Sequence, residues 1–411
     1  MTNAQHTVVV DLGYGDAGKG TVVDWLCATG PIFAVIRFNG GAQAAHNVVA
    51  SDGRHHTFSQ FGSGSFQPGV RTHLSRFTVV DPVLLAMEER HLAAFGVSTW
   101  ERLTIDEGAL LATPWHRAAN RLRETRRGGE RHGSCGVGVG EVMAFSLAHP
   151  DDAPRVGDVR DPARLRRVFQ VVREKLSTEL GDLGYDVPVD DVAAIYEDFG
   201  RTVSIVDRSY CAELLTAGPC VFEGAQGVLL DEWRGWHPYT TWSTTTFDNA
   251  STLLAEAGQQ ARRLGVVRAY TTRHGPGPMV TENSELTAAL PDVYNTDGRW
   301  QGAFRVGHFD AVAHRYAVEV CGGVDGLAVT HLDVASRTPD LRMCSSYSTC
   351  DRIVPGEFGD LAYQEKLTAE LFTAEPILAG TPTADAISSA LDAPVLLESW
   401  GPTAADKRAR A

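Results

Sequence analysis

The stretch "HTVVVDLGYGDAGKGTVVDWL", residues 6–26, decides the fold class. An apolar run of strand length leads into a glycine-rich turn, and a segment with helical character follows. Four residues separate Gly13 from Gly18, and Lys19 comes next, as in a phosphate-binding loop. A loop of this kind between a strand and a helix predicts that nucleotide phosphates bind at the N-terminus of the helix.

The loop departs from the usual pattern at two positions. Gly20 stands where serine or threonine is expected, and Asp16 lies inside the loop. Gly15, Gly18 and Gly20 let backbone amides approach phosphate oxygens, and Lys19 adds a point charge. Because the magnesium-binding hydroxyl is missing, the Asp16 carboxylate is the candidate replacement. A simple turn with no ligand is the alternative interpretation.

The rest of the chain continues the same alternation. Short apolar runs such as "FAVIRF" (residues 33–38) alternate with longer helix-like segments. This pattern predicts an α/β fold, P-loop-NTPase-like, with a mostly parallel central sheet flanked by helices. Residues 123–206 are rich in Arg, Asp and Glu and include an amphipathic helical pattern. We expect a single domain, residues 1–411, with a helical insertion at about 123–206; a separate subdomain is the alternative.

Composition narrows the classes of partner. The formal net charge of −14 argues against a general nucleic-acid or membrane-surface binder, since both need a basic face. Seven cysteines without a CxxC pair suggest neither a disulfide framework nor a zinc site. The sequence shows no signal-peptide pattern and no apolar run of membrane-spanning length, so we expect a cytoplasmic location.

Eight segments together resemble a known family. They are, in chain order, "GYGDAGKG", "RFNGGAQAAHNVV", "FEGAQGVLLD", "HPYTTWSTTT", "RAYTTRHGPGP", "FRVGHFDAVAHRYA", "VTHLDV" and "ESWGP". Each is similar to the corresponding segment of the adenylosuccinate synthetases, and the set extends from Asp11 to Pro402. That family joins L-aspartate to C6 of IMP and splits GTP to GDP and phosphate. The resemblance implies the same reaction type and a homodimer.

The resemblance also implies catalytic roles. Asp16 is expected to be the general base that removes the N1 proton of the purine. O6 is then phosphorylated, and the amine of aspartate displaces the phosphate. Lys19 and His46 are expected to act on the phosphoryl group in transfer. Mg²⁺ is the implied cofactor, with the Asp16 carboxylate and the Ala45 carbonyl as ligands. The alternative for His46 is a solvated loop residue.

Binding residues follow from the same segments. The implied nucleotide-binding residues are Gly15, Gly18, Gly20, Gln43, Ser134, Gln226, Thr241, Asp333, Ser399 and Gly401. Asp333 would accept hydrogen bonds from N1 and N2 of guanine; a polar residue at a strand end is the alternative. Thr296, Arg299 and Arg305 are the candidates for binding aspartate, since arginine binds carboxylates bidentately.

Several departures concern the acceptor and the amino acid. Residues 132–147, "HGSCGVGVGEVMAFSL", lack the family's phosphate-binding threonine and the arginine that a dimer partner supplies. Ser134 is the nearest hydroxyl, and the candidate replacement cations are Arg127, Arg131 and Arg155. Ala45 replaces a glycine. The aspartate loop reads "NTDGRWQGAFR", residues 295–305, with fewer cations.

These departures leave the acceptor open. His331 replaces a lysine beside Asp333, so ATP remains an alternative to GTP. The acceptor is expected to be IMP or a related 6-oxopurine nucleotide. Alternatives are a dGMP-type enzyme that makes 2-amino-6-succinylaminopurine nucleotides, and a nucleoside synthetase of secondary metabolism. A non-catalytic nucleotide-binding regulator is disfavoured, because a sensor needs no general base.

Overall fold

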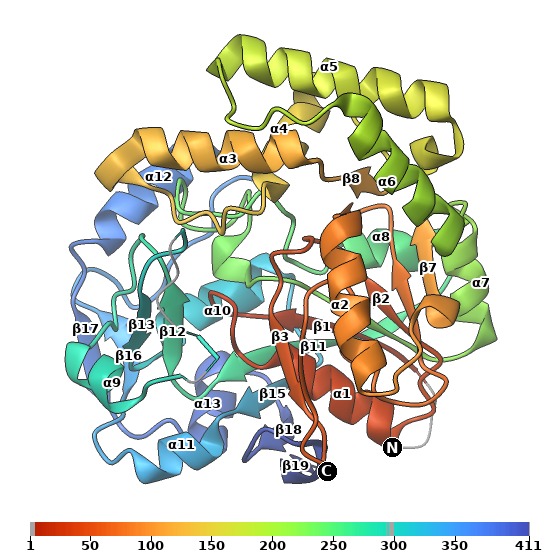
Figure 1. The fold of residues 1–411 in the computed structure, drawn as a ribbon. Coiled ribbons are helices and arrows are strands. Elements are labelled where there is room, and N and C mark those ends of the chain that lie inside the picture. Colours follow the sequence, from red (N-terminus) through yellow and green to blue (C-terminus); the bar gives the residue numbers. More distant parts are fainter. Residues whose placement is uncertain (1–4, 293, 296–299, 411) are drawn as a thin grey trace.

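A ten-stranded sheet forms the centre of the computed structural model, which describes residues 5–292, 294–295 and 300–410 (Figure 1). Its strands are, in spatial order, β19 (Lys407–Ala409), β18 (Val395–Ser399), β15 (Gly326–Thr330), β11 (Ala261–Arg268), β1 (His6–Asp11), β10 (Cys220–Glu223), β2 (Ala34–Arg37), β5 (Arg71–Leu74), β7 (Leu103–Asp106) and β9 (Ser204–Val206). All neighbours are parallel except β18 and β19. The predicted α/β fold with a mostly parallel sheet is therefore confirmed.

The central position of β1 follows from its sequence. Every residue of "HTVVVD" is buried, and valine suits a strand that is covered on both faces. Parallel strands end at the same edge of a sheet, so the segments that follow them meet there. The loops after β1, β2, β10, β15 and β18 carry most of the candidate site residues.

Helices cover both faces of this sheet (Figure 1). Outside the region between β8 and β9, the described α-helices are α1 (Lys19–Thr29), α2 (Pro82–Ala94), α7 (Tyr210–Ala217), α8 (Asp248–Glu256), α9 (Ser284–Ala289), α10 (Ala311–Val320), α11 (Leu332–Arg337), α12 (Leu361–Leu371) and α13 (Ala384–Leu391). Smaller sheets pair β3 (His46–Val49) with β4 (His55–Phe58), β6 (Val79–Val80) with β8 (Leu110–Leu111), and β12 (Thr271–His274) with β13 (Phe304–Gly307). Of the helices, α9 packs against β13 of a smaller sheet. A further sheet joins β14 (Phe309–Asp310), β16 (Met343–Tyr347) and β17 (Pro376–Ala379).

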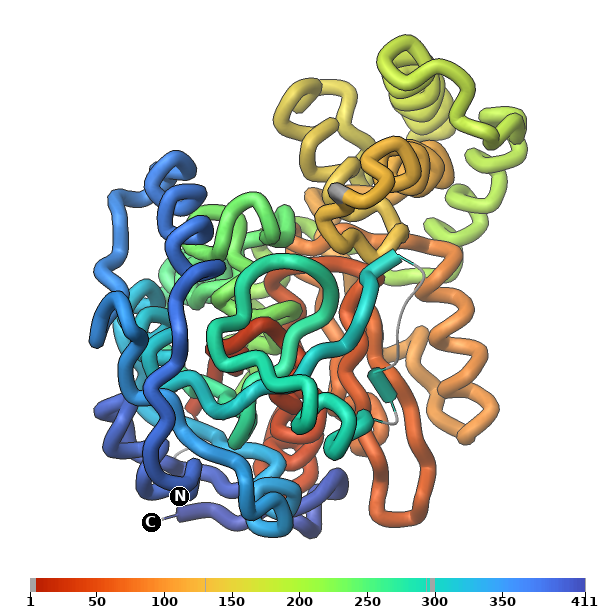
Figure 2. The backbone as a smooth tube through the Cα atoms, turned by 90° about the vertical axis from the view of Figure 1, so that its left-hand side faces the viewer, coloured from red at the N-terminus to blue at the C-terminus, as the bar shows by residue number. Residues whose placement is uncertain are grey.

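Four helices follow one another between β8 and β9. They are α3 (Pro114–Arg127), α4 (Val139–Ala148), α5 (Pro162–Leu180) and α6 (Val189–Thr202), and they project together from one end of the body (Figure 2). The helical region begins earlier than the expected residue 123, because Thr113 caps α3 and a proline occupies its first turn. After α6, β9 returns to the edge of the main sheet beside β7.

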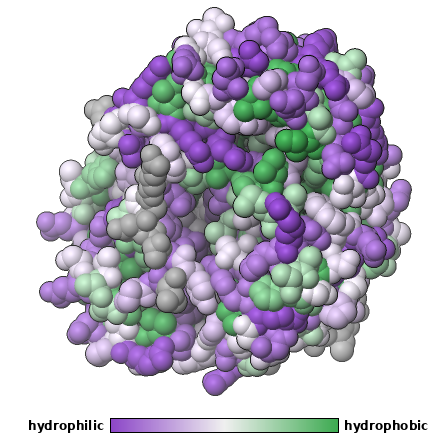
Figure 3. Space-filling view, in the orientation of Figure 1, coloured by the Kyte–Doolittle hydropathy of each residue, from purple (hydrophilic) through white to green (hydrophobic). Residues whose placement is uncertain are grey.

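The face of the molecule shown in Figure 3 is mainly polar. On this face, hydrophobic residues form separate small patches among hydrophilic ones. Within the described ranges, no helix combines the length and the apolar character needed to cross a membrane.

Candidate active site

The phosphate loop between β1 and α1 is organised by a carboxylate below it. Asp11 accepts hydrogen bonds from the backbone N–H groups of Gly13 (2.8 Å) and Ala17 (2.9 Å). Its Oδ2 also lies 3.1 Å from Nζ of Lys19, and this ammonium donates to the carbonyl of Gln226 at 2.7 Å. Lys19 is therefore buried at the edge where β1 and β10 end, beside the first turn of α1. The sequence offered no role for Asp11.

Gly20 explains why the usual hydroxyl is missing from this loop. A Cβ atom at position 20 would lie 2.8 Å from Cβ of His46 and 3.1 Å from Oγ of Ser63. Interiors are close-packed, so a serine or threonine at this position would displace β3. The space that a magnesium-binding hydroxyl would need is occupied by His46.

Asp16 has the environment of a proton acceptor. Its side chain is 24% exposed, and its backbone is left-handed with φ 57°. Burial raises the pKa of Asp16, although the charges of His274 and Lys19 act in the opposite direction. The nearest imidazole is that of His274, whose Nε2 lies 3.6 Å from Oδ2 of Asp16. A raised carboxylate pKa brings the group closer to the range that suits general-base catalysis.

Among the described residues, three of the four non-glycine residues with a left-handed backbone lie at one edge of the sheet; the fourth, Asp392, ends α13. Gln226 after β10 and His331 after β15 also have left-handed backbones, each with φ 58°. Such conformations are costly for residues other than glycine, and they concentrate at functional sites. Together with Asp16, they mark the ends of β10, β1 and β15; β10 and β1 are neighbours, and β11 lies between β1 and β15. This supports placing the site at the C-terminal edge.

A buried carboxylate fixes the His46 imidazole. Nδ1 of His46 lies 2.6 Å from Oε1 of Glu223, the last residue of β10. Burial opposes ionisation, yet Arg37 and His46 lower the pKa of Glu223 to about 2. An ionised carboxylate only accepts, so the proton must be on Nδ1. Burial lowers the pKa of His46 to about 4, which leaves Nε2 unprotonated at neutral pH. Ser63 also donates to Glu223 through its backbone N–H (2.9 Å) and its hydroxyl.

Two glutamine side chains lie close together at the same edge of the sheet. Gln43 lies between β2 and β3, and Gln226 lies after β10. The Oε1 atoms of both are buried without a hydrogen-bond partner. They flank the Gly40–Gly41 turn, where added Cβ atoms would lie 3.1 Å from Oε1 of Gln226 and 3.2 Å from Oε1 of Gln43. Buried acceptors without partners are costly, so this surface suits a ligand that donates hydrogen bonds.

The glycine-rich loop before α4 closes the far end of this surface. A Cβ at Gly41 would lie 3.2 Å from Val139, and one at Gly140 would lie 3.0 Å from the ring of Trp242. Thr241 precedes this tryptophan, and its backbone N–H donates to the carbonyl of Leu230. The end of this loop, where α4 begins, therefore borders both the Gln43 segment and the Thr241 segment.

Ser134 lies on this loop, but its hydroxyl is engaged. It donates to Oδ1 of Asn120 on α3 at 2.9 Å, so its proton is not available to a phosphate in this state. Counting from Gly136 and Gly138, the arginine of the family's segment falls on Leu147. Leu147 lies on α4 and is 66% exposed.

The C-terminal ends of β15 and β18 have the features of a base-binding site. Asp333 lies in the first turn of α11, is 29% exposed and pairs with Arg337 at 2.9 Å. Ser399 ends β18, the neighbour of β15, so it lies beside this helix start. The Lys407 ammonium donates to the carbonyls of Gly401 (2.8 Å) and Thr403 (2.9 Å), and burial lowers its pKa to about 8. The Asp333 carboxylate, at the start of α11, and the Lys407 ammonium, which donates to the 401–403 segment after β18, thus both lie at this end of the site.

The predicted amino-acid site is only partly described. Thr296 and Arg299 lie outside the described residues. Arg305 pairs with Oε2 of Glu282 at 2.5 Å and donates to the carbonyls of Gly275 (2.6 Å) and Gly277 (3.0 Å). Its guanidinium therefore supports the 275–277 turn in this state.

The same region differs from the family at two adjacent positions. Phe304 stands where the family segment has its first arginine, and His274 stands where it has valine. Their rings lie 4.9 Å apart. Nδ1 of His274 is buried without a partner, and its Nε2 faces both Asp16 and Oδ1 of Asn295 (3.3 Å). An imidazole therefore adjoins the candidate general base.

The described residues fit Mg²⁺ only with help from a nucleotide. No cluster of three or more His, Cys, Asp or Glu side chains with metal-binding geometry occurs in the described part of the chain. Asp16 offers a partly exposed carboxylate, and the exposed Ala45 adjoins His46. Magnesium commonly takes one or two carboxylates together with phosphate oxygens and water. This donor set agrees with that preference.

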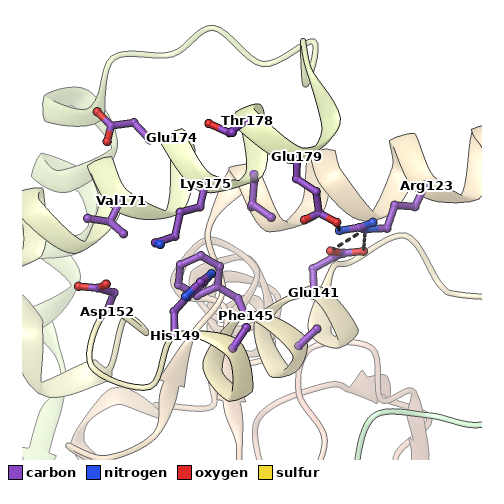
Figure 4. A pocket seen from close by; sticks show the side chains of 13 residues that line it. Arg123, Glu141, Phe145, His149, Asp152, Val171, Glu174, Lys175, Thr178 and Glu179 are labelled. Carbon is purple, nitrogen blue, oxygen red and sulfur yellow. Dashed lines mark hydrogen bonds and ion pairs between the residues drawn. The ribbon is translucent and has the colours of Figure 1, made fainter.

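A separate cavity of about 750 Å³ lies between α4 and α5 (Figure 4). Its lining includes the ion-paired Arg123, Glu141 and Glu179, together with His149 and Lys175. None of the candidate site residues lines it. The C-terminal edge of the sheet, where the candidate residues lie, is therefore the better candidate for catalysis.

Known proteins share this sequence and this fold. A family model described as adenylosuccinate synthetase matches residues 8–379. The chain is 33% identical over 358 residues to the adenylosuccinate synthetase of Desulfovibrio desulfuricans, covering 83% of this chain and 81% of that protein. It is 35% identical over 373 residues to the adenylosuccinate synthetase of Alkalilimnicola ehrlichii, covering 85% and 82%.

Two solved structures resemble it at 20% sequence identity. Fully ligated adenylosuccinate synthetase from Plasmodium falciparum has a TM-score of 0.84, with 99% of this chain and 100% of that chain covered. Cyanophage S-2L succinoaminodeoxyadenylate synthetase, bound to dGMP and to dATP as an energy donor, has a TM-score of 0.64, with 99% and 96% covered. At this identity, the two matches support the fold.

Proposed function

The chain belongs to the adenylosuccinate synthetase family, and we propose that it joins L-aspartate to C6 of IMP at the site described above. Family members are C–N ligases that use GTP. The observation that carries the assignment is the convergence of Asp16, Lys19 and His46 at the C-terminal edge of the sheet. A regulator that only binds nucleotide would need neither the general base nor a buried, oriented imidazole.

The first step is phosphorylation of the purine. Asp16 accepts the N1 proton, and O6 attacks the γ-phosphorus of GTP as the β–γ bridging bond breaks and GDP leaves. Lys19 neutralises charge on the phosphates, and His46 contacts the phosphoryl group in transfer. In the second step the amine of aspartate attacks C6, phosphate leaves, and the amine loses a proton. The product is adenylosuccinate.

The cofactor and the assembly are part of the proposal. Mg²⁺ would be held by the Asp16 carboxylate and the Ala45 carbonyl, and would neutralise charge on the nucleotide phosphates. Gly15, Gly18 and Gly20 would present backbone amides to those phosphates. We further propose a homodimer and a cytoplasmic location, as the family resemblance implies.

The acceptor is identified by an assay of phosphate release with GTP, aspartate and Mg²⁺. The acceptors are IMP, dGMP, inosine and deoxyguanosine, each at matched concentration. Release with IMP that exceeds release with dGMP by a factor of ten or more supports the proposal. A reversed order supports the dGMP-type alternative. No release with any acceptor, in the presence of both GTP and ATP, would contradict ligase activity.

The donor preference gives a second prediction. A carboxylate at Asp333 accepts from two guanine donors that adenine does not present in the same arrangement, and sites built on such bonds discriminate strongly. We expect Asp333→Asn to lower the GTP-to-ATP ratio of kcat/KM by roughly 10- to 100-fold, at about 1.5–3 kcal/mol for hydrogen bonds to a charged group. Arg337→Gln, which removes only the surface partner of Asp333, is the matched control. A wild type that uses ATP as well as GTP would refute this role.

A further inference from the structure

Two arginines flank an aromatic ring above the acceptor loop. The guanidinium carbon of Arg121 lies 5.9 Å from the ring centre of Trp300, and that of Arg131 lies 5.8 Å from it. The ring itself lies on Gly136, where an added Cβ would be 2.8 Å from it. Nε of Arg121 also donates to the carbonyl of Gly136 at 3.0 Å. Both arginines are therefore held close to the glycine-rich loop before α4.

These two arginines differ from the neighbouring arginines in whether a carboxylate pairs with the guanidinium group. Arg117, Arg123 and Arg127 on the same helix are paired with Asp81, Glu141 and Glu124, respectively. Among the side chains that the structure describes, neither Arg121 nor Arg131 has a carboxylate partner; Nε of Arg131 donates to a backbone carbonyl, that of Glu124. Two positive charges without a carboxylate partner among the described side chains thus lie against the same Trp300 ring at the loop.

The position of the loop relates these charges to the acceptor. Residues 133–140 border the Gly40–Gly41 turn through Val139 and the Thr241 segment through Gly140. Two of the three candidate replacement cations are set aside by the structure. Arg127 is neutralised by Glu124, and Arg155 lies beside Gly108 and Leu110, where no interaction of the described residues joins it to the 133–140 loop. Arg131 remains, and the structure adds Arg121, which the sequence alone did not indicate.

We propose that Arg121 and Arg131 bind the 5′-phosphate of the acceptor from within the same chain. This inference rests on the proposed function, and it specifies that the acceptor is a nucleoside 5′-monophosphate. Planar guanidinium groups bind phosphate bidentately, and anchoring on Trp300 and Gly136 reduces the freedom that such binding would otherwise cost. The pair supplies the positive charge that is missing at Leu147 and compensates for the engaged hydroxyl of Ser134.

The test compares phosphorylated and unphosphorylated acceptors in the Arg121→Gln and Arg131→Gln variants. We expect each change to raise the KM and the calorimetric Kd of IMP by roughly 10- to 150-fold, the usual effect of losing hydrogen bonds to a charged group. The kcat/KM for inosine should stay within about twofold. Arg121→Lys should recover part of the loss, because lysine retains the charge without the bidentate geometry.

The matched control is Arg126→Gln. Arg126 lies on the same helix and donates to the carbonyl of Leu180, away from the loop. Its loss should therefore leave the KM of IMP and the kcat/KM of inosine unchanged. If Arg121 and Arg131 had a merely structural role, their loss would impair the use of IMP and of inosine equally. This outcome would overturn the inference. Unchanged IMP affinity in both variants would do the same. If no acceptor is turned over, the proposed function fails, whereas calorimetry with IMP still decides the role of the arginines.

Discussion

We expect the Asp16→Asn variant to lose about a hundredfold or more in kcat, which is the usual contribution of a general base. Asparagine keeps the size and most of the hydrogen-bonding capacity of aspartate, but it cannot accept the N1 proton. The surroundings of Asp16 raise the pKa of its carboxyl, so the native group is a stronger base than an exposed aspartate. The KM for GTP should change only severalfold, because Lys19 and the loop amides remain. Steady-state phosphate release with saturating acceptor gives both values.

Two controls separate the roles of this carboxylate. If Asp16 acted only as a magnesium ligand, excess Mg²⁺ would restore the kcat of Asp16→Asn; a deficit that persists at saturating metal indicates lost proton transfer. Asp106→Asn removes another buried carboxylate, at the end of β7, which accepts from the N–H of Gly108 outside the site. Near-normal turnover in Asp16→Asn would refute the assignment, and a similar loss in Asp106→Asn would indicate a general structural effect.

The fold could be predicted because its signals are local. Each apolar run and each glycine turn is a property of adjacent residues, as in the run that forms β1 and the loop that follows it. The start of the helical region at Pro114 was missed by nine residues, although the Thr113 cap and the following proline were available as signals. Strand order could not be read in this way, because the pairing of β1 with β10 and β11 joins residues more than 200 positions apart.

The site could be predicted in part for the same reason. Asp16, Lys19 and His46 stand in recognisable segments, whereas Asp11, Glu223 and His274 become interpretable only through their contacts. Glu223 lies in the quoted segment "FEGAQG", yet its role depends on a partner 177 residues away. The exclusion of a hydroxyl at Gly20 likewise depends on the packing of β3 against α1. Such relations are set by tertiary structure and leave no pattern along the chain.

The His46–Glu223 pair has a consequence for phosphoryl transfer. Because Nδ1 donates to Glu223 and burial lowers the pKa of His46 to about 4, the ring is neutral before substrates bind. To donate from Nε2 to a phosphate oxygen, the ring must gain a second proton. The adjacent ionised Glu223 and the negative charge of the nucleotide both favour the imidazolium. Glu223 is thus a positioning residue that also stabilises the charged ring.

We therefore expect His46→Ala to lower kcat by roughly 10²- to 10⁴-fold and Glu223→Gln to lower it by at least about tenfold. Glu223 accepts from Nδ1 of His46 with Oε1 and from the N–H of Ser63 with Oε2, whereas glutamine has a single acceptor oxygen. The variant can therefore keep the bond to His46, while the negative charge and the bond from the N–H of Ser63 are lost. The decisive measurement is the double variant. If Glu223 acts through His46, the double variant should be no slower than His46→Ala alone, because residues that act as a unit are not additive. Losses that multiply would instead assign Glu223 an independent role in holding the core, and thermal unfolding of each variant would then show the corresponding loss of stability.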